Sequence, residues 1–262
     1  MSDALVDTNV YLSRWPFRRL PLDEPEALVA KLKEHQVSQA WAGSFDGLLH
    51  KDIASVNERL ASECTRHGKG LLVPFGSINP ALPDWEEDIR RCHEDFKMPG
   101  IRLHPNYHGY KLDEPVFEKL LRLATERRLI VQIAISMEDR RTQSALMPVQ
   151  PVNVTPLAKI IERIPGARVQ LLNALLFVKG TPLLSTLAAG NVLVEIATLE
   201  GVGGIENLLQ SVPFEKVAFG SYAPFFNFES AMLKLRESKL GSKQATAITS
   251  ENAKTLLQSG GA

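Results

Sequence analysis

Residues 115–135 read PVFEKLLRLATERRLIVQIAI, and this stretch joins the two patterns that decide the fold. Its first part, 115–127, has the spacing of apolar residues that is typical of an amphipathic helix. Its last part, 129–135, is short and apolar on both faces, as buried parallel strands are. A helix that leads directly into a buried strand is the repeating unit of α/β proteins.

The same alternation continues along the chain. Strand patterns lie at 4–10, 37–42, 70–75, 100–103, 129–135, 167–172, 191–196 and 216–219. Helical patterns lie at 24–34, 53–66, 85–96, 115–127, 155–163, 182–189, 204–210, 228–237 and 244–258. Eight such units predict a closed (β/α)8 TIM barrel, a fold of about 250 residues. No linker interrupts the pattern, so we expect one domain, 1–262.

An open doubly wound sheet is the structural alternative to the barrel. Such a sheet usually carries a glycine-rich phosphate loop after its first strand. The corresponding segment here, 7–12, reads DTNVYL and is not a loop of that kind. The sequence therefore favours the barrel.

The composition argues against several classes of partner. Lys and Arg together number 30, as do Asp and Glu, so the formal net charge is zero. Because binding to nucleic acid or to an anionic membrane surface needs a basic excess, we expect neither partner. No apolar run approaches the ~20 residues of a membrane span. No signal peptide is visible, so we expect a cytoplasmic protein with reduced cysteines. A neutral chain has little charge repulsion against self-association, and a homo-oligomer is compatible with this.

Polar residues follow most of the predicted strands. In a TIM barrel, the carboxyl ends of the strands carry the active site. The polar residues expected at these ends include Asn9, Arg18, Asp46, His50, Arg102, His104, His108, Gln132, Glu138, Asn173, Glu195 and Tyr222. We therefore expect a site for a small-molecule substrate at this end of the barrel.

Several segments resemble the amidohydrolase-related family, which includes metal-dependent decarboxylases and lactone hydrolases. Residues 99–105, PGIRLHP, are similar to the family's Gly-(Ile/Val/Phe)-(Arg/Lys)-Leu-His-Pro turn. Residues 219–224, FGSYAP, are similar to its Phe-Gly-Ser-Asp-x-Pro segment. Residues 6–11, VDTNVY, resemble its first strand, which ends in His-x-His, and 168–173, RVQLLN, resemble a strand that ends in His. The resemblance spans nearly the whole chain and implies the same barrel.

At the family's metal-ligand positions this chain carries other residues. The resemblance places Asn9 and Tyr11 at the His-x-His pair, and Ala134 at or near the histidine that ends the fifth strand. It places Asn173 at the next histidine and Tyr222 at the aspartate. A catalytic zinc site needs three imidazole, thiolate or carboxylate donors around an open position. We therefore expect neither a metal nor a cofactor, and we do not carry over the family's metal-activated water.

Four residues are candidates for acid-base chemistry. His104 ends the fourth strand, and Asp46 follows the second strand at a position where it could orient His50 as a base. Glu138 lies in a charged loop after the fifth strand and could pair with Asp46. The alternative interpretation is that Asp46 caps a turn and that the loop around Glu138 is a solvated surface.

A further set of residues is predicted to bind substrate. Its members are Asn9, Arg18, Arg102, His108, Gln132, Asn173 and Tyr222. The two arginines could grip a carboxylate or phosphate through paired hydrogen bonds. Burying an amide costs free energy unless it is paired, so Gln132 and Asn173 should join a hydrogen-bond network or bind a ligand. The alternative for the segment around Arg18 is a structural plug or a subunit contact.

Three functions remain open. The leading hypothesis is a metal-independent hydrolase or lyase that acts on a small anionic or polyhydroxylated molecule. The second is a catalytically inactive ligand-binding or scaffold protein, which a barrel mouth filled by Tyr11, Trp15 and Tyr222 would favour. The third is a metal-dependent hydrolase with relocated ligands. His104 and His108 have a suitable spacing of four for it, but they flank a segment that we interpret as a loop.

Overall fold

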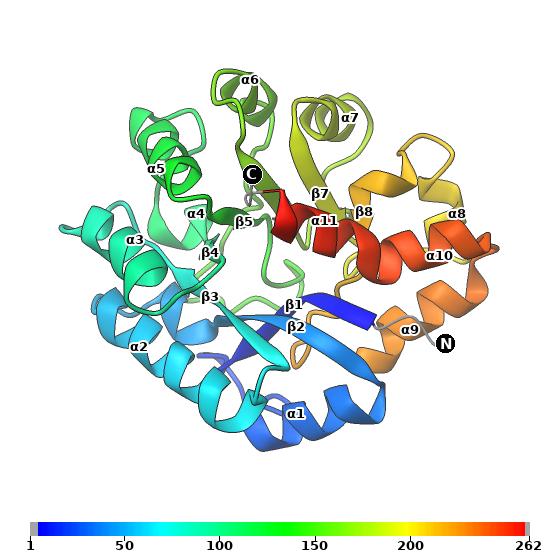
Figure 1. Ribbon diagram of the computed structural model, residues 1–262, viewed down its shortest axis with the longest axis horizontal. Coiled ribbons are helices and arrows are strands. Elements are labelled where there is room, and N and C mark those ends of the chain that lie inside the picture. Colours follow the sequence, from blue (N-terminus) through cyan, green and yellow to red (C-terminus); the bar gives the residue numbers. More distant parts are fainter. Residues whose placement is uncertain (1–4, 260–262) are drawn as a thin grey trace.

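The computed structural model describes residues 5–259, and its strands form one parallel sheet in sequence order (Figure 1). The eight strands are β1 (Leu5–Leu12), β2 (Val37–Ser44), β3 (Leu72–Ser77), β4 (Gly100–Leu103), β5 (Ile130–Ala134), β6 (Arg168–Leu172), β7 (Asn191–Glu195) and β8 (Val217–Ala218). Thr8 N donates to Phe219 O at 3.0 Å and Tyr11 N to Ala223 O at 2.9 Å, which joins β1 to the segment of β8. The (β/α)8 prediction is confirmed. The expected first strand residue, Ala4, lies outside the described residues.

Helices surround the sheet (Figure 1). The α-helices are α1 (Pro25–Glu34), α2 (Ile53–Glu63), α3 (Trp85–Glu94), α4 (Pro105–His108), α5 (Pro115–Glu126), α6 (Leu157–Glu162), α7 (Gly180–Ala188), α8 (Gly204–Leu208), α9 (Phe228–Glu237), α10 (Ser242–Thr246) and α11 (Asn252–Gln258). The predicted terminal helix, 244–258, consists of α10, a π-helical turn and α11 in succession. The interpretation of 105–107 as a loop is wrong: these residues belong to the one-turn helix α4, which Pro105 begins with the φ angle that a helix requires.

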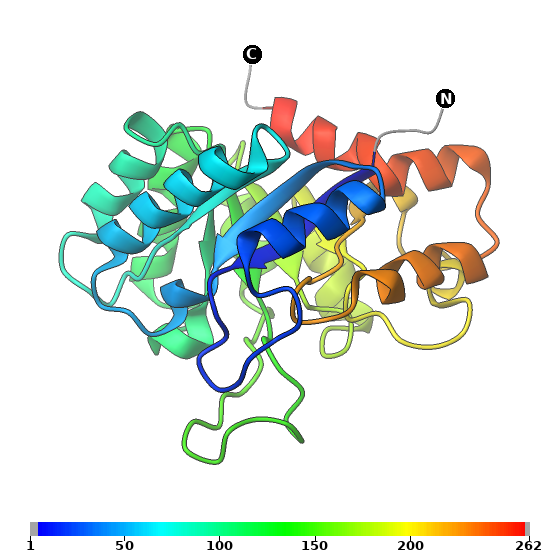
Figure 2. The same ribbon diagram turned by 90° about the horizontal axis from the view of Figure 1, so that it is seen from below.

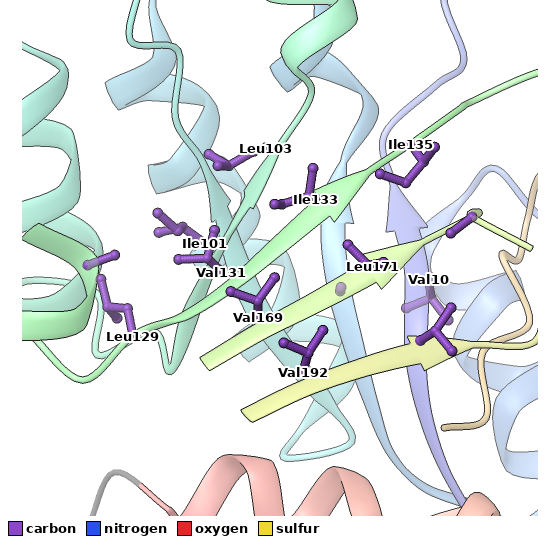
Figure 3. Packing of buried hydrophobic residues seen from close by; sticks show 14 of the residues in the cluster. Val10, Ile101, Leu103, Leu129, Val131, Ile133, Ile135, Val169, Leu171 and Val192 are labelled. Carbon is purple, nitrogen blue, oxygen red and sulfur yellow. The ribbon is translucent and has the colours of Figure 1, made fainter. Parts of the chain in front are cut away.

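The stretch 115–135 folds as its pattern predicts. In α5 the buried residues are Phe117, Leu120, Leu121 and Ala124, one helical stripe, and all five residues of β5 are buried. Figure 3 shows alternate residues of β4, β5 and β6 gathered in one apolar cluster, with Ile101, Val131 and Val169 side by side. Each such buried side chain contributes about 1.5–3 kcal/mol to stability, which makes this layer the main support of the barrel.

The other face of the same strands is polar. Arg102, Gln132 and Gln170 occupy neighbouring register positions of β4, β5 and β6, and all three are fully buried. Arg102 Nε donates to Gln132 Oε1 at 2.8 Å, Gln132 Nε2 to Gln170 Oε1 at 2.8 Å, and Gln170 Nε2 to Thr8 Oγ1 at 2.7 Å. The chain of bonds connects β4 to β1. Gln132 therefore belongs to a hydrogen-bond network, as the cost of burying its amide predicted.

Arg102 lies inside the barrel wall. Besides the bond to Gln132, its terminal nitrogens donate to the carbonyl oxygens of Val10 at 2.8 Å and Trp41 at 3.0 Å. Burial lowers the pKa of its guanidinium, while the nearby Tyr11 and Asp7 oppose the shift. Arg102, which was predicted to bind an anionic substrate, is thus hydrogen-bonded to protein groups.

The two ends of the barrel differ. At the amino ends of the strands, Ala253 and Leu256 of α11 pack with Val6, Trp41 and Ile130. Figure 2 shows α11 on one side of the molecule, while the loop after β1 and the long loop after β5 project on the opposite side. The carboxyl ends of the strands, and with them the predicted site, lie on the side of these two loops.

Candidate ligand-binding site

A buried polar cluster joins the ends of β1, β6 and β7. Asn9 Nδ2 donates to Asn173 Oδ1 at 2.9 Å and to Glu195 Oε1 at 3.3 Å. Asn173 donates its backbone N–H to Glu195 Oε1 and its side-chain amide to Ser136 O, the latter at 2.9 Å. Burial raises the pKa of Glu195 to about 7. Two positions where the family carries metal ligands are therefore bonded to each other, and Asn173 is part of a network as predicted.

A second carboxylate holds the segment that follows β8. Asp7 Oδ1 accepts from the backbone N–H groups of Asn9 and Ser221, both at 3.0 Å, and the Ser221 hydroxyl donates to Asp7 Oδ2. Burial raises the pKa of Asp7 to about 6. The next residue, Tyr222, has φ of 59°, and Asn173 has φ of 53°. Because a left-handed backbone is costly for residues other than glycine, contacts of this kind are needed to hold it.

Tyr11 and His104 form a buried pair. The Tyr11 hydroxyl lies 3.0 Å from His104 Nε2, and the Arg102 guanidinium carbon lies 4.4 Å from the centre of the Tyr11 ring. Burial holds the pKa of His104 well below its usual value, and His108 and Arg102 add to the shift. The His108 ring, also buried, lies 2.9 Å from Gly47 O through Nε2, and burial lowers its pKa as well.

Aromatic side chains fill the centre of this end. Tyr11, Trp15 and Tyr222 are 0%, 2% and 1% exposed, and they belong to one cluster with Met137. The Tyr222 hydroxyl donates to Met137 O at 2.6 Å. His104 is 0% exposed, so solvent does not reach the imidazole predicted to be catalytic. We call the residues Asn9, Tyr11, Trp15, His104, Asn173, Glu195 and Tyr222 the central mouth.

The predicted pair Asp46 and His50 lies on the surface. His50 Nε2 is 3.9 Å from Asp46 Oδ1, and Arg59 donates to Asp46 Oδ2 at 3.2 Å. The side chains of His50 and Asp46 are 54% and 28% exposed. The turn before them is capped by Ser44, whose hydroxyl accepts from Asp46 N, and not by Asp46 itself. Within residues 5–259, no hydrogen bond or ion pair joins this pair to His104.

Arg18 and Glu138 connect the two projecting loops. The Arg18 guanidinium donates to Glu138 Oε1 and lies 5.0 Å from the centre of the Phe225 ring. The Arg18 side chain is 44% exposed, whereas that of Glu138 is 2% exposed. Arg18, which was predicted to bind an anionic substrate, is thus paired with Glu138, which was predicted to be catalytic.

A cavity of about 380 Å³ opens beside the central mouth, over the ends of β5 to β8. Most of the exposed area of its wall is apolar, and its apolar and aromatic lining residues are Met137, Leu176, Phe177, Ala197, Leu199, Tyr222 and Phe226. Its polar and charged lining consists of Ser136, Glu138, Asp139, Asn173, Thr198, Glu200, Ser230 and Lys234. We call this the side cavity. Its size lies in the range of small-molecule sites, about 300–1,000 Å³.

The side cavity contains three of the predicted site residues and one that the sequence did not indicate. Glu138, Asn173 and Tyr222 line it, as predicted residues. Lys234 was not predicted, because it lies on α9 within an ordinary helical pattern, far from any strand end in sequence. Its Nζ donates to Ile196 O at 3.2 Å and also to the carbonyl oxygen of the next residue. Only the folded chain brings this amine to the cavity.

The chain belongs to the amidohydrolase family. Residues 16–172, more than half of the chain, match the family described as Amidohydrolase. This confirms the resemblance that the sequence motifs indicated. No curated protein matches the chain.

Several solved structures with the same fold are decarboxylases. The 5-carboxyvanillate decarboxylase of Novosphingobium aromaticivorans, with bound manganese and 3-methoxy-4-hydroxy-5-nitrobenzoic acid, has a TM-score of 0.76 at 13% identity over 98% of this chain and 97% of that one. The 2,6-dihydroxybenzoate decarboxylase from Rhizobium has a TM-score of 0.73 at 11% identity, over 96% and 99%. A dihydroxybenzoic acid decarboxylase from Polaromonas sp. JS666, with bound manganese and 2-nitroresorcinol, has 0.75 at 10%, over 98% and 97%. At these identities the likeness establishes the fold.

The residues at the family's ligand positions do not fit a metal ion. The Asn9 amide and the Tyr11 hydroxyl face protein partners, and Ala134 has no donor atom. The Asn173 amide donates to Ser136 O and accepts from Asn9, and the Tyr222 hydroxyl donates to Met137 O. Among residues 5–259, no three His, Cys, Asp or Glu side chains come together as metal ligands would. These positions do not fit a metal ion because they carry amides and phenols in place of imidazoles and a carboxylate.

The structure also bears on membrane association. In the described part of the chain, no helix is both long enough and apolar enough to cross a bilayer.

Proposed function

We propose that this amidohydrolase-family barrel binds a small organic molecule in its side cavity and does not use metal chemistry. One observation carries the proposal. The side chains at the family's ligand positions bond to protein groups, and Tyr11, Trp15 and Tyr222 fill the central mouth. This is the arrangement that favours the ligand-binding hypothesis over an enzyme centred on His104.

The lining of the side cavity indicates the class of ligand. Its wall is mostly apolar, so the body of the ligand should be apolar as well. Glu138 and Asp139 are already paired with Arg18 and Arg141, which leaves the amine of Lys234 as the basic group available to a ligand oxygen. A small aromatic or aliphatic molecule with one carbonyl or carboxylate group meets both requirements.

A metal-independent lyase or hydrolase is the second candidate. Glu138 and Lys234 supply an acid-base residue and an amine to one cavity, and such groups can move protons at a bound substrate. Several of the similar structures are decarboxylases, which are lyases. In this candidate the reaction takes place in the side cavity, away from His104, which is buried in the central mouth, and from Asp46 and His50, which lie on the surface.

Thermal unfolding with a panel of hydroxybenzoates, and separately with Mn²⁺, tests the binding proposal. A ligand at 100 times its Kd stabilises the folded state by about 2.7 kcal/mol, which raises the Tm of a domain of this size by roughly 5–10 °C. We expect such a rise for at least one aromatic acid and no rise with Mn²⁺.

Two tryptophan variants locate the binding site. Ser230→Trp places a large ring at the side cavity and should abolish the rise in Tm. Ser185→Trp, at an exposed position on α7, should leave the rise unchanged. Stoichiometric Mn²⁺ binding, or an equal response of both variants to the aromatic acid, would contradict the proposal.

A further inference from the structure

Lys234 is the only lysine or arginine among the described residues that line the side cavity. Its Nζ donates to the carbonyl oxygens of Ile196 and Ala197, at the end of β7. Among residues 5–259, Nζ has no further hydrogen-bond or ion-pair partner. The two carbonyl acceptors take up two of the positions around Nζ and leave one position without a protein partner among the described residues.

The surroundings also make the amine easier to deprotonate than a lysine in water. Burial lowers the pKa of Lys234, and this effect exceeds the opposing influence of Glu195, Glu200 and Glu237. Lysines that are desolvated in apolar pockets act as nucleophiles toward carbonyl groups because more of the amine is uncharged. Thr198 lines the same cavity, and its buried hydroxyl oxygen has no hydrogen-bond partner among the described residues.

We propose that Lys234 forms an imine with a small, mostly apolar aldehyde or ketone bound in the side cavity. The lone pair of Nζ attacks the carbonyl carbon and a C–N bond forms. The carbonyl oxygen then leaves as water with the two protons of the amine, and no oxidant or reductant is needed. The inference rests on the proposed binding in the side cavity and names the substrate class and the reacting atom.

Reductive trapping tests this inference. The full-length protein is incubated with benzaldehyde and sodium cyanoborohydride, digested, and mapped by mass spectrometry. Reduction of the imine fixes a benzyl group on the reacting nitrogen, so the modified lysine can be identified. We expect the adduct on Lys234 before any other lysine, and its loss in Lys234→Arg.

Lys216 is a matched control. Burial lowers its pKa too, and its Nζ donates to Gly190 O at 2.7 Å, but it does not line the side cavity. Lys216→Arg should therefore keep the adduct on Lys234. Ser230→Trp retains the amine but obstructs the cavity, and it should lose the adduct even if Lys234→Arg folds poorly. Equal labelling of Lys216 and Lys234, or labelling that survives Ser230→Trp, would overturn the inference.

The two proposals can fail separately. If benzaldehyde or an aromatic acid raises the Tm but no adduct forms on Lys234, the cavity binds ligands and the imine inference is wrong. If no compound raises the Tm and no adduct forms, both proposals are wrong.

Discussion

The central mouth and the side cavity lie at the same end of the barrel, but they are built from opposite kinds of contact. In the central mouth, Asn9 donates to Asn173 and Glu195, and Tyr11 lies against His104. Three polar atoms buried there, Asn9 Oδ1, Trp15 Nε1 and His104 Nδ1, have no hydrogen-bond partner among the described residues. In the side cavity, apolar walls surround an amine that has only backbone partners. The comparison shows that Asn9 and Tyr11, which stand where the family carries metal ligands, are packed inside the barrel, whereas Asn173 and Tyr222 lie on the boundary between the two regions and also line the side cavity.

The largest expected effect concerns the polar layer beneath the central mouth. Arg102→Met removes the donors for the oxygens of Val10, Trp41 and Gln132, all inside the barrel. An unsatisfied buried polar group costs about 1–3 kcal/mol, so we expect a loss of roughly 3–5 kcal/mol in the free energy of unfolding, measured with urea. As a control, Arg122→Ala removes an exposed ion pair and should cost less than about 1 kcal/mol. Equal losses would mean that the layer does not support the barrel.

The second prediction concerns pH. Burial raises the pKa of Glu195 to about 7 from an ordinary value of 4.5, so the folded state binds this proton more tightly than the unfolded state. Its contribution to stability is therefore complete below about pH 4.5 and is lost as the pH rises through about 7. At 1.36 kcal/mol for each pKa unit, the loss is about 3 kcal/mol.

Unfolding by urea at pH 5 and pH 8 measures this loss, with Glu195→Gln as the comparison. Asp7, with a pKa raised to about 6, contributes in the same direction in both proteins, so the variant should keep part of the pH dependence. The wild-type protein should lose more stability than the variant because it alone carries Glu195. The same pH dependence in both proteins would show that Glu195 does not titrate in this range.

A smaller effect separates packing from hydrogen bonding in the central mouth. Tyr11→Phe keeps the ring but loses the contact with His104, and should cost about 1 kcal/mol. Tyr110→Phe is the matched control, because the Tyr110 hydroxyl is buried without a hydrogen-bond partner among the described residues, and it should cost nothing. Binding in the side cavity should be unchanged in both variants. If Tyr11→Phe weakens ligand binding, the two regions are coupled and the comparison above does not hold.

The smallest effect on stability is expected at the rim of the side cavity. Arg18 is 44% exposed, so solvent screens its pair with Glu138, and Arg18→Ala should cost less than about 1 kcal/mol. The variant leaves Glu138 without its cation, so an anionic ligand should bind more weakly, while a neutral ligand should bind as before. Calorimetric titration at low and high salt tests this, since added salt should reduce the difference.

Part of the site could be predicted from sequence. Gln132 and Asn173 stand among apolar strand residues, and the cost of burying an amide correctly predicted that each joins a network. The partners could not be predicted, because the amides of Asn9 and Asn173 meet across 164 residues of chain. Nor could the spacing of His104 and His108 reveal a one-turn helix, since a proline such as Pro105 is common both in loops and at the first position of a helix.

By itself, the sequence determined the barrel and the loss of the family's metal ligands. Both follow from local information: the spacing of apolar residues selects strands and helices, and the identity of a side chain decides whether it can bind a metal. Only the tertiary structure decided which polar groups are hydrogen-bonded to other protein groups in the interior and which stay accessible to a ligand. Lys234 reaches the side cavity, and Arg102 does not, because strand alternation and helix packing set the direction of each side chain in space.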